Sequence, residues 1–159
     1  MGATMNPKEF TVMCIEDNDD HVELARTAIT QSMRGCRFIR FADAESAMQY
    51  MLKDCVSNDL RQRSSADLIL LDLSLPGMNG LTFLKRLKSY HRTKRIPVIV
   101  LTISSDEEEI ANAYHLGANS YIVKPLHEEE FIIKLVELSM YWSLTAEVPN
   151  PIGAAAASR

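Results

Sequence analysis

The sequence predicts a doubly wound α/β domain, in which parallel strands alternate with helices. The first indication is a set of four short apolar runs rich in β-branched residues and Leu, because strands buried on both faces of a sheet read as continuous apolar runs. The second is that segments with helical spacing of apolar residues lie between the runs. The four predicted central strands are Phe10–Ile15, Asp67–Leu71, Ile96–Thr102 and Asn119–Val123.

A weaker run and five helical segments complete the alternation. Arg37–Ala42 alternates polar and apolar side chains, as an edge strand does. The second and fourth helices open on cap residues and acids, which helix N-termini favour, and Gly117 is expected to end the fourth helix. Helices are expected to begin near Asp19, Asp43, Gly80, Ser105 and His127.

The length of 159 residues corresponds to one ordinary domain, so we expect no separate output module. We assign residues 1–8 to an N-terminal tail, 9–147 to the folded domain and 148–159 to a disordered C-terminal tail. Pro149 and Pro151 should stop the last helix, and the alanines that follow bury little surface.

Composition narrows the functional classes. A net charge of −4 disfavours nucleic-acid binding without a strong local basic patch, and the best candidate patch, Arg61–Arg63, is short. No apolar run reaches the roughly 20 residues that span a bilayer. Cys14, Cys36 and Cys55 are odd in number and lack metal-type spacing, as expected in a reducing cytoplasm. We therefore predict a cytoplasmic protein without nucleic-acid or membrane partners.

Polar residues follow or close four of the predicted strands. Glu16 and Asp17 follow the first strand, Asp72 the third and Lys124 the fifth, while Thr102 ends the fourth. In an open parallel sheet these strand ends lie along one edge, which is where ligands bind. Any one acid at a strand end is more often a helix cap or a solvated loop residue, but together these five residues predict a functional crevice.

Clustered carboxylates repel one another unless a cation neutralises them. Mg²⁺ prefers oxygen ligands and commonly takes one or two carboxylates with phosphate and water. We expect Asp17 and Asp72 to be direct ligands together with the backbone carbonyl of Ser74, and Glu16 to act through water. Asp72 would then be the nucleophile in an in-line attack on a phosphoryl donor. Lys124 and the hydroxyl of Thr102 would balance the charge of the transferred group.

Four segments in order resemble the response-regulator receiver family, over about Phe10 to Leu144. The resemblance implies a flavodoxin-like sheet with strand order 2-1-3-4-5 and five helices. The segments are Ile-Glu-Asp-Asn at 15–18, Leu-Ile-Leu-Leu-Asp-Leu-Ser-Leu-Pro-Gly-Met-Asn-Gly at 68–80, Val-Ile-Val-Leu-Thr at 98–102 and Tyr-Ile-Val-Lys-Pro at 121–125.

The resemblance also implies residue roles and a mechanism. The protein would take a phosphoryl group from a histidine kinase, catalyse that transfer and its own slow dephosphorylation, and act on no separate substrate. A cis Lys124–Pro125 bond is expected, as in relatives. Ser74 and Ile103 depart from the commonest pattern and affect the expected phosphoryl lifetime. The implied roles are phosphoacceptor for Asp72, acidic pair for Glu16 and Asp17, switch residues for Thr102 and Tyr121, and phosphate contact for Lys124.

The segment from Met140 to Pro149, with its Tyr141-Trp142 pair, is similar to the end of single-domain regulators that serve bacterial and cyanobacterial phytochromes. The expected partner is therefore a phytochrome-type sensor kinase, and a histidine phosphotransfer protein is a candidate further partner. A haloacid-dehalogenase-type enzyme would need a second Asp where Ser74 stands. A pseudo-receiver that only binds proteins would lack part of the phosphorylation set, and nothing is missing here.

The last helix has more apolar residues than one buried stripe requires, which predicts a homodimer. One face carries Phe131, Leu135, Leu138 and Trp142, which we assign to the dimer interface. A neighbouring face carries Ile133, Val136, Met140 and Leu144, and one of the two faces must cover the sheet. The alternative is that the excess packs beneath the tail.

Overall fold

A five-stranded parallel sheet forms the centre of the computed structural model, which describes residues 9–56 and 66–145. The strand order is β2-β1-β3-β4-β5, and every neighbouring pair is parallel. The predicted fold class and strand order are confirmed. The strands are β1 (Thr11–Ile15), β2 (Arg37–Phe41), β3 (Leu68–Leu71), β4 (Val98–Thr102) and β5 (Ser120–Val123).

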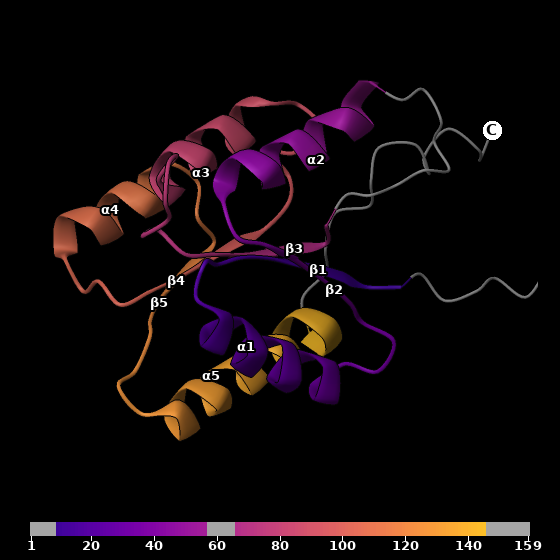
Figure 1. Cartoon of the computed structure of the whole chain (residues 1–159), viewed down its shortest axis with the longest axis vertical. Coiled ribbons are helices and arrows are strands. Elements are labelled where there is room, and N and C mark those ends of the chain that lie inside the picture. The colour runs from indigo at the N-terminus through magenta and orange to yellow at the C-terminus, as the bar shows by residue number, and fades with distance from the viewer. Residues whose placement is uncertain (1–8, 57–65, 146–159) are drawn as a thin grey trace, which may run out of the picture.

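Helices cover both faces of the sheet, with α2, α3 and α4 on one face and α1 and α5 on the other (Figure 1). Each helix begins within two residues of its predicted start. A short π-helical turn, η1 (Tyr141–Thr145), follows the last helix. The helices are α1 (Asp19–Ser32), α2 (Ala44–Val56), α3 (Gly80–Ser89), α4 (Glu107–His115) and α5 (Glu128–Met140).

Local hydrogen bonds explain where the helices begin and end. Asn18, Asn79 and Asp106 accept backbone N–H groups of the first turns of α1, α3 and α4 through their side chains. Asp43 does the same at the start of α2. Gly117 follows α4 with a φ of +103°, a left-handed conformation that favours glycine, so its predicted role at the end of that helix is confirmed.

Burial separates central from edge strands. The side chains of β1, β3 and β4 are all buried, because helices cover them on both faces. Those of β2 are exposed or half-buried, as its alternating pattern predicted.

The prediction of a central position for Asn119–Val123 is wrong, since β5 is the other edge and its side chains are half-buried. The hydroxyl of Tyr114 accepts the N–H of Tyr121 at 3.1 Å, which satisfies a donor on that open edge.

Several predictions concern residues outside the described ranges: the two tails, the Arg61–Arg63 segment and the side chain of Cys55. Cys14 is buried and Cys36 half-buried, and both are free thiols. Across residues 9–56 and 66–145, no helix is long and apolar enough to cross a membrane.

The first residue of α3 lies against the strand end that carries Asp72. A Cβ on Gly80 would lie 2.5 Å from the backbone oxygen of Asp72 and 2.6 Å from Cα of Leu73. Both are main-chain atoms that cannot turn away as a flexible side chain does. Glycine at this position therefore lets the helix approach the functional edge of the sheet.

We expect Gly80→Ala to lower the free energy of unfolding by about 2 kcal/mol, because α3 must shift to accommodate the methyl group. Urea denaturation measures the change. The matched control is Gly35→Ala, where the added Cβ meets nothing within 4 Å and only the φ of +75° opposes the substitution. That control should cost about 1 kcal/mol. Equal losses in the two variants would show that the contact with the Asp72 backbone does not matter.

Candidate functional site

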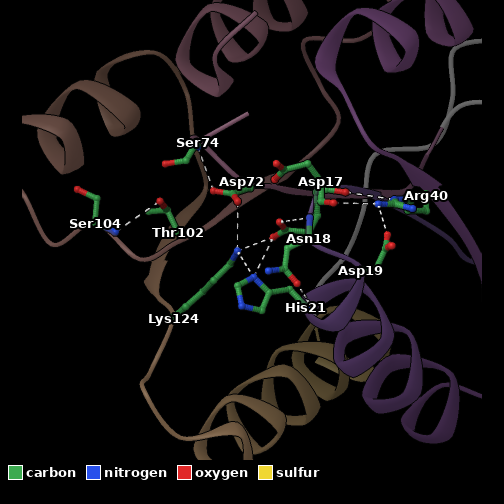
Figure 2. Close-up of polar contacts among 11 residues, drawn as sticks. Asp17, Asn18, Asp19, His21, Arg40, Asp72, Ser74, Thr102, Ser104 and Lys124 are labelled. Carbon is green, nitrogen blue, oxygen red and sulfur yellow. Dashed lines mark hydrogen bonds and ion pairs between the residues drawn. The ribbon is translucent and has the colours of Figure 1, made fainter. Parts of the chain in front are cut away.

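Main-chain hydrogen bonds fix the residues that follow the strands. The N–H of Glu16 donates to the oxygen of Phe41 at 3.0 Å, and the N–H of Asp72 donates to the oxygen of Ile15 at 3.0 Å. The N–H of Lys124 donates to the oxygen of Thr102 at 2.7 Å. The sheet ladder thus continues one residue beyond β1, β3 and β5, and it brings these side chains to one edge. Figure 2 shows Asp72 and Lys124 at this edge together with Asp17.

Three carboxylates gather at this edge. Glu16, Asp17 and Asp72 each offer an oxygen within 4.8 Å of the others. Glu16 and Asp72 are buried, whereas Asp17 is exposed. The three acids therefore form a group that can hold a metal ion, as their positions at the strand ends predicted.

Lys124 lies against two of these acids. Its ammonium, Nζ, donates to Oε2 of Glu16 and to Oδ2 of Asp72, the latter at 3.2 Å. A third contact joins Nζ to Nδ1 of His21 at 3.1 Å. Figure 2 shows the Lys124 side chain extending between Asp72 and the His21 ring. One cation thus serves two buried anions and an imidazole.

The remaining carboxylate oxygens of the buried acids accept backbone N–H groups. Oδ1 of Asp72 accepts the N–H of Ser74 at 3.1 Å, and Oε1 of Glu16 accepts the N–H of Asn18 at 3.0 Å. Each buried acid is therefore bonded through both oxygens, one to the chain and one to Lys124. Ser74 is exposed and contacts Asp72 through its N–H.

Burial controls the protonation of two groups. It raises the pKa of Glu16 to about 7, against the opposing effect of the hydrogen bond and charge of Lys124. Burial lowers the pKa of His21, and the positive charge of Lys124 lowers it further. His21 is therefore the neutral imidazole at neutral pH, and its Nδ1 accepts the hydrogen bond from Lys124.

The predicted switch residues lie on the side of the site nearer α4. Thr102 is fully buried, and its hydroxyl accepts the N–H of Ser104 at a long 3.5 Å. The hydroxyl of Tyr121 has two acceptors at hydrogen-bond distance, the backbone oxygen of Ser104 at 3.1 Å and Oε1 of Glu109 at 2.9 Å. Burial and the Glu109 carboxylate raise the pKa of Tyr121 to about 12. Both side chains thus meet the loop between β4 and α4.

Two residues of the site were not predicted from the sequence. His21 belongs to no motif, although its place in the first turn after the acidic pair was a usable sign. Arg40 extends from β2, donating to the backbone oxygens of Glu16 at 3.2 Å and Asp17 at 3.3 Å, and forms an ion pair of 2.8 Å with Asp19. It holds the loop that carries the acidic pair, and only the strand pairing reveals this role.

The expected cis Lys124–Pro125 bond is wrong, because the described residues contain no cis peptide bond. The expectation assumed that a tight turn must aim Lys124 into the crevice. The main-chain bond to Thr102 already gives Lys124 that direction, so no turn is needed there.

The dimer-interface assignment is wrong for Phe131 and Leu135. Phe131 and Leu135 are buried in the apolar cluster beneath the sheet, and Leu138 and Trp142 pack against the same cluster half-buried. This face of α5 packs against the protein's own core. The exposed large apolar side chains of α5 and η1 are Ile132, Ile133, Met140, Tyr141 and Leu144.

The sequence matches the family model of the response regulator receiver domain over residues 12–136. The chain belongs to the response regulator receiver family. Among curated relatives, this receiver is 31% identical to the "Probable methanogenesis regulatory protein FilR2" of Methanothrix harundinacea, over 89% of each chain. It is 27% identical to the response regulator Rcp1 of Synechocystis sp., over 94% of this chain and 99% of Rcp1.

Solved structures show the same likeness to this receiver. The phosphorylated cyanobacterial phytochrome response regulator RcpA superposes with a TM-score of 0.81 at 31% identity, over 89% of this chain and 99% of RcpA. The Mn²⁺-bound form of Rcp1 superposes with a TM-score of 0.80 at 26% identity, with the same coverage. Receivers are phosphoacceptor modules of two-component signalling.

Removing the cation from the buried acids of the receiver should destabilise it in a pH-dependent way. We expect Lys124→Ala to cost of order 3 kcal/mol at pH 8 in metal-free buffer, because two buried carboxylates lose their partner. The raised pKa of Glu16 means that stability is lost as pH rises toward and through about 7. Without Lys124 this pKa rises further, so the part of the deficit that comes from Glu16 should be smaller at pH 5 than at pH 8.

Urea denaturation at the two pH values, with a chelator present, measures this deficit. Lys134→Ala is the matched control, since Lys134 forms only an exposed ion pair with Glu130 at 3.7 Å. A deficit for Lys124→Ala that is equal at both pH values would contradict the proposed balance of charge.

Proposed function

We propose that this receiver accepts a phosphoryl group on Asp72 from the phosphohistidine of a sensor kinase, and that it then signals through protein–protein contacts. The observation that carries the proposal is the setting of Asp72. Its carboxylate lies beside two further acids, with Lys124 on one oxygen and a backbone N–H on the other. One cation neutralises an acid that has only a structural role. Here three carboxylates share one ammonium, so the remaining negative charge can bind a further cation.

The donor set fits Mg²⁺. Three carboxylates with one ammonium among them leave unneutralised oxygen ligands, the kind that Mg²⁺ prefers. We expect Asp17 and Asp72 to hold the ion together with the carbonyl of Ser74, and Glu16 to act through water. The relative Rcp1 has been solved in a form that binds the divalent cation Mn²⁺. When bound, the ion would neutralise charge on the transferred phosphoryl group.

In the reaction, a carboxylate oxygen of Asp72 forms the new P–O bond while the P–N bond to the donor imidazole breaks. The imidazole keeps the electron pair and takes up a proton. Lys124 exchanges a carboxylate contact for a phosphoryl oxygen, and the Thr102 hydroxyl turns from its long contact with Ser104 toward the same group. Water then hydrolyses the acyl phosphate slowly, without a separate substrate.

A phytochrome-type kinase is the partner that we propose. RcpA is a cyanobacterial phytochrome response regulator and RtBRR a bacteriophytochrome response regulator, and each is 31% identical to this chain. The Tyr141 and Trp142 rings, which pack edge to face at 5.5 Å, form the aromatic pair on which the sequence resemblance rests. The free thiols of Cys14 and Cys36 support a place for this exchange in the reducing cytoplasm.

We expect Asp72→Asn to abolish phosphoryl uptake while the protein stays folded, because the amide keeps the shape but is no nucleophile. Incubation with acetyl phosphate and Mg²⁺, followed by mass spectrometry of the intact protein, measures uptake. Asp43→Asn is the matched control, since Asn caps α2 as well as Asp does and lies outside the site. Chelation of Mg²⁺ should stop uptake by the unmodified protein. Undiminished phosphate on Asp72→Asn would refute the assignment.

We further propose a homodimer formed by the outer face of α5 and η1. Ile133, Met140 and Leu144 are spaced by seven and four residues, so they lie along one side of the helical segment, and all are exposed. Tyr141 lies beside them and is 54% exposed. An apolar stripe of this kind usually marks an interface, and pairing of like surfaces about a two-fold axis is the commonest solution.

The Ile133→Asp, Met140→Asp double variant should therefore sediment as a monomer at micromolar concentration, where the unmodified protein sediments as a dimer. Analytical ultracentrifugation measures both. Leu126→Asp is the control, because Leu126 is 99% exposed and lies outside the stripe. A monomeric parent protein, or a double variant that still dimerises, would exclude this interface.

A further inference from the structure

The ammonium of Lys124 has three N–H donors, and three acceptors surround it. Two of them are the carboxylates of Glu16 and Asp72. The third is Nδ1 of His21, at 3.1 Å. The two carboxylates are enough to neutralise the charge of Lys124. The hydrogen bond to the neutral imidazole of His21 therefore needs a separate explanation.

His21 is held firmly at this position. Its backbone N–H donates to Oδ1 of Asn18 at 3.1 Å, which fixes the first turn of α1. Its ring packs edge to face against Phe131 of α5, with the centroids 6.1 Å apart at 72°. Phe131 is itself buried in the core, so it cannot yield readily. The ring therefore presents Nδ1 to Lys124 without relying on a flexible side chain.

The hydrogen bonds around His21 form a closed circuit. The Glu16 carboxylate accepts from Asn18 through one oxygen and from Lys124 through the other. The side-chain oxygen of Asn18 accepts the backbone N–H of His21, and the ring Nδ1 of His21 accepts from Lys124. The position of the ammonium is thus tied to the start of α1 by two routes, one through an acid and one through the imidazole.

These two routes respond differently to a divalent cation. Glu16 and Asp72 would hold Lys124 less strongly if their oxygens also held a divalent cation, because the cation would compete for those oxygens and repel the ammonium. The imidazole is already bonded to Lys124 through Nδ1, and His21 does not belong to the acid group that can hold a metal. Its hydrogen bond to the ammonium would therefore remain when the acids hold an ion.

We propose that His21 is a positioning residue for phosphoryl transfer, which keeps the Lys124 ammonium at the crevice while the divalent cation occupies the acids. This rests on the proposed function of Asp72 as acceptor. With one N–H on His21, Lys124 has its other donors free for the oxygens of the incoming phosphoryl group. Nδ1 of His21 also lies 3.7 Å from Oε2 of Glu16, beyond hydrogen-bond distance, so its hydrogen bond in the site is the one with Lys124.

The test uses the full chain with acetyl phosphate and Mg²⁺, and follows the second-order rate constant of phosphorylation by mass spectrometry. His21→Ala should lower that constant about tenfold, the usual effect of losing a group that orients a contacting residue. His21→Asn should restore most of it, because its amide oxygen lies as many bonds from the backbone as Nδ1 does. His21→Gln should not, because its oxygen lies one bond further out. All three variants keep the N–H bond to Asn18.

Two further measurements separate positioning from a structural role. The Mg²⁺ affinity, measured by calorimetry, should stay within about twofold in every variant, whereas a damaged acid cluster would lower it in parallel with the rate. In a Lys124→Ala background, His21→Ala should have no additional effect, because the residue through which it acts is gone.

The outcomes are distinguishable. Failure of the unmodified protein to take up phosphate would overturn the proposed function itself. Normal phosphorylation of His21→Ala, a parallel loss of Mg²⁺ affinity, failure of Asn to rescue, or an additive loss with Lys124→Ala would each overturn the role of His21 while leaving that function intact.

Discussion

The burial of two carboxylates side by side is the constraint on which the site depends. The side chains of Glu16, Asp72 and Lys124 are 6%, 9% and 4% exposed. Two acids this close cannot both remain ionised in a low dielectric without a cation between them. Lys124 meets that requirement, and the backbone amides of Asn18 and Ser74 take the remaining oxygens. An ion or phosphoryl group that approaches these two buried acids must therefore compete with bonds already made, whereas the exposed carboxylate of Asp17 is open to it.

The sheet supplies the accuracy that such an arrangement needs. Glu16, Asp72 and Lys124 each continue the main-chain ladder by one residue before the chain turns away. Their Cα positions are consequently set by the strands, which are the most buried part of the molecule. A carboxylate on a free loop would need many side-chain contacts to be held as well.

The sequence predicted the strands from their apolar patterns and the site residues from the strand ends. It predicted little that depends on how the elements pack together. Continuous apolar runs identified the strands, and the residues after them identified Glu16, Asp72 and Lys124, because both follow from the parallel sheet alone. His21 and Arg40 were missed, since their roles depend on how α1 and β2 pack beside β1. The choice between the two faces of α5 failed for a similar reason: both are apolar, and only docking against α1 decides that Phe131 is buried.

The polar contacts on the two sides of the site differ in strength. On the side of α1, Lys124 is fixed by two carboxylates and an imidazole, so moving it requires compensating charge. On the side of α4, the contact between Thr102 and Ser104 is 3.5 Å, at the outer limit of a hydrogen bond. Rotation of the Thr102 hydroxyl toward Asp72 breaks only this weak hydrogen bond, whereas displacement of Lys124 breaks charge-assisted hydrogen bonds. Under the proposed function, we therefore expect a phosphoryl group on Asp72 to attract the Thr102 hydroxyl first. The loop at Ser104, which Tyr121 also contacts, would then be the first part of the main chain to move.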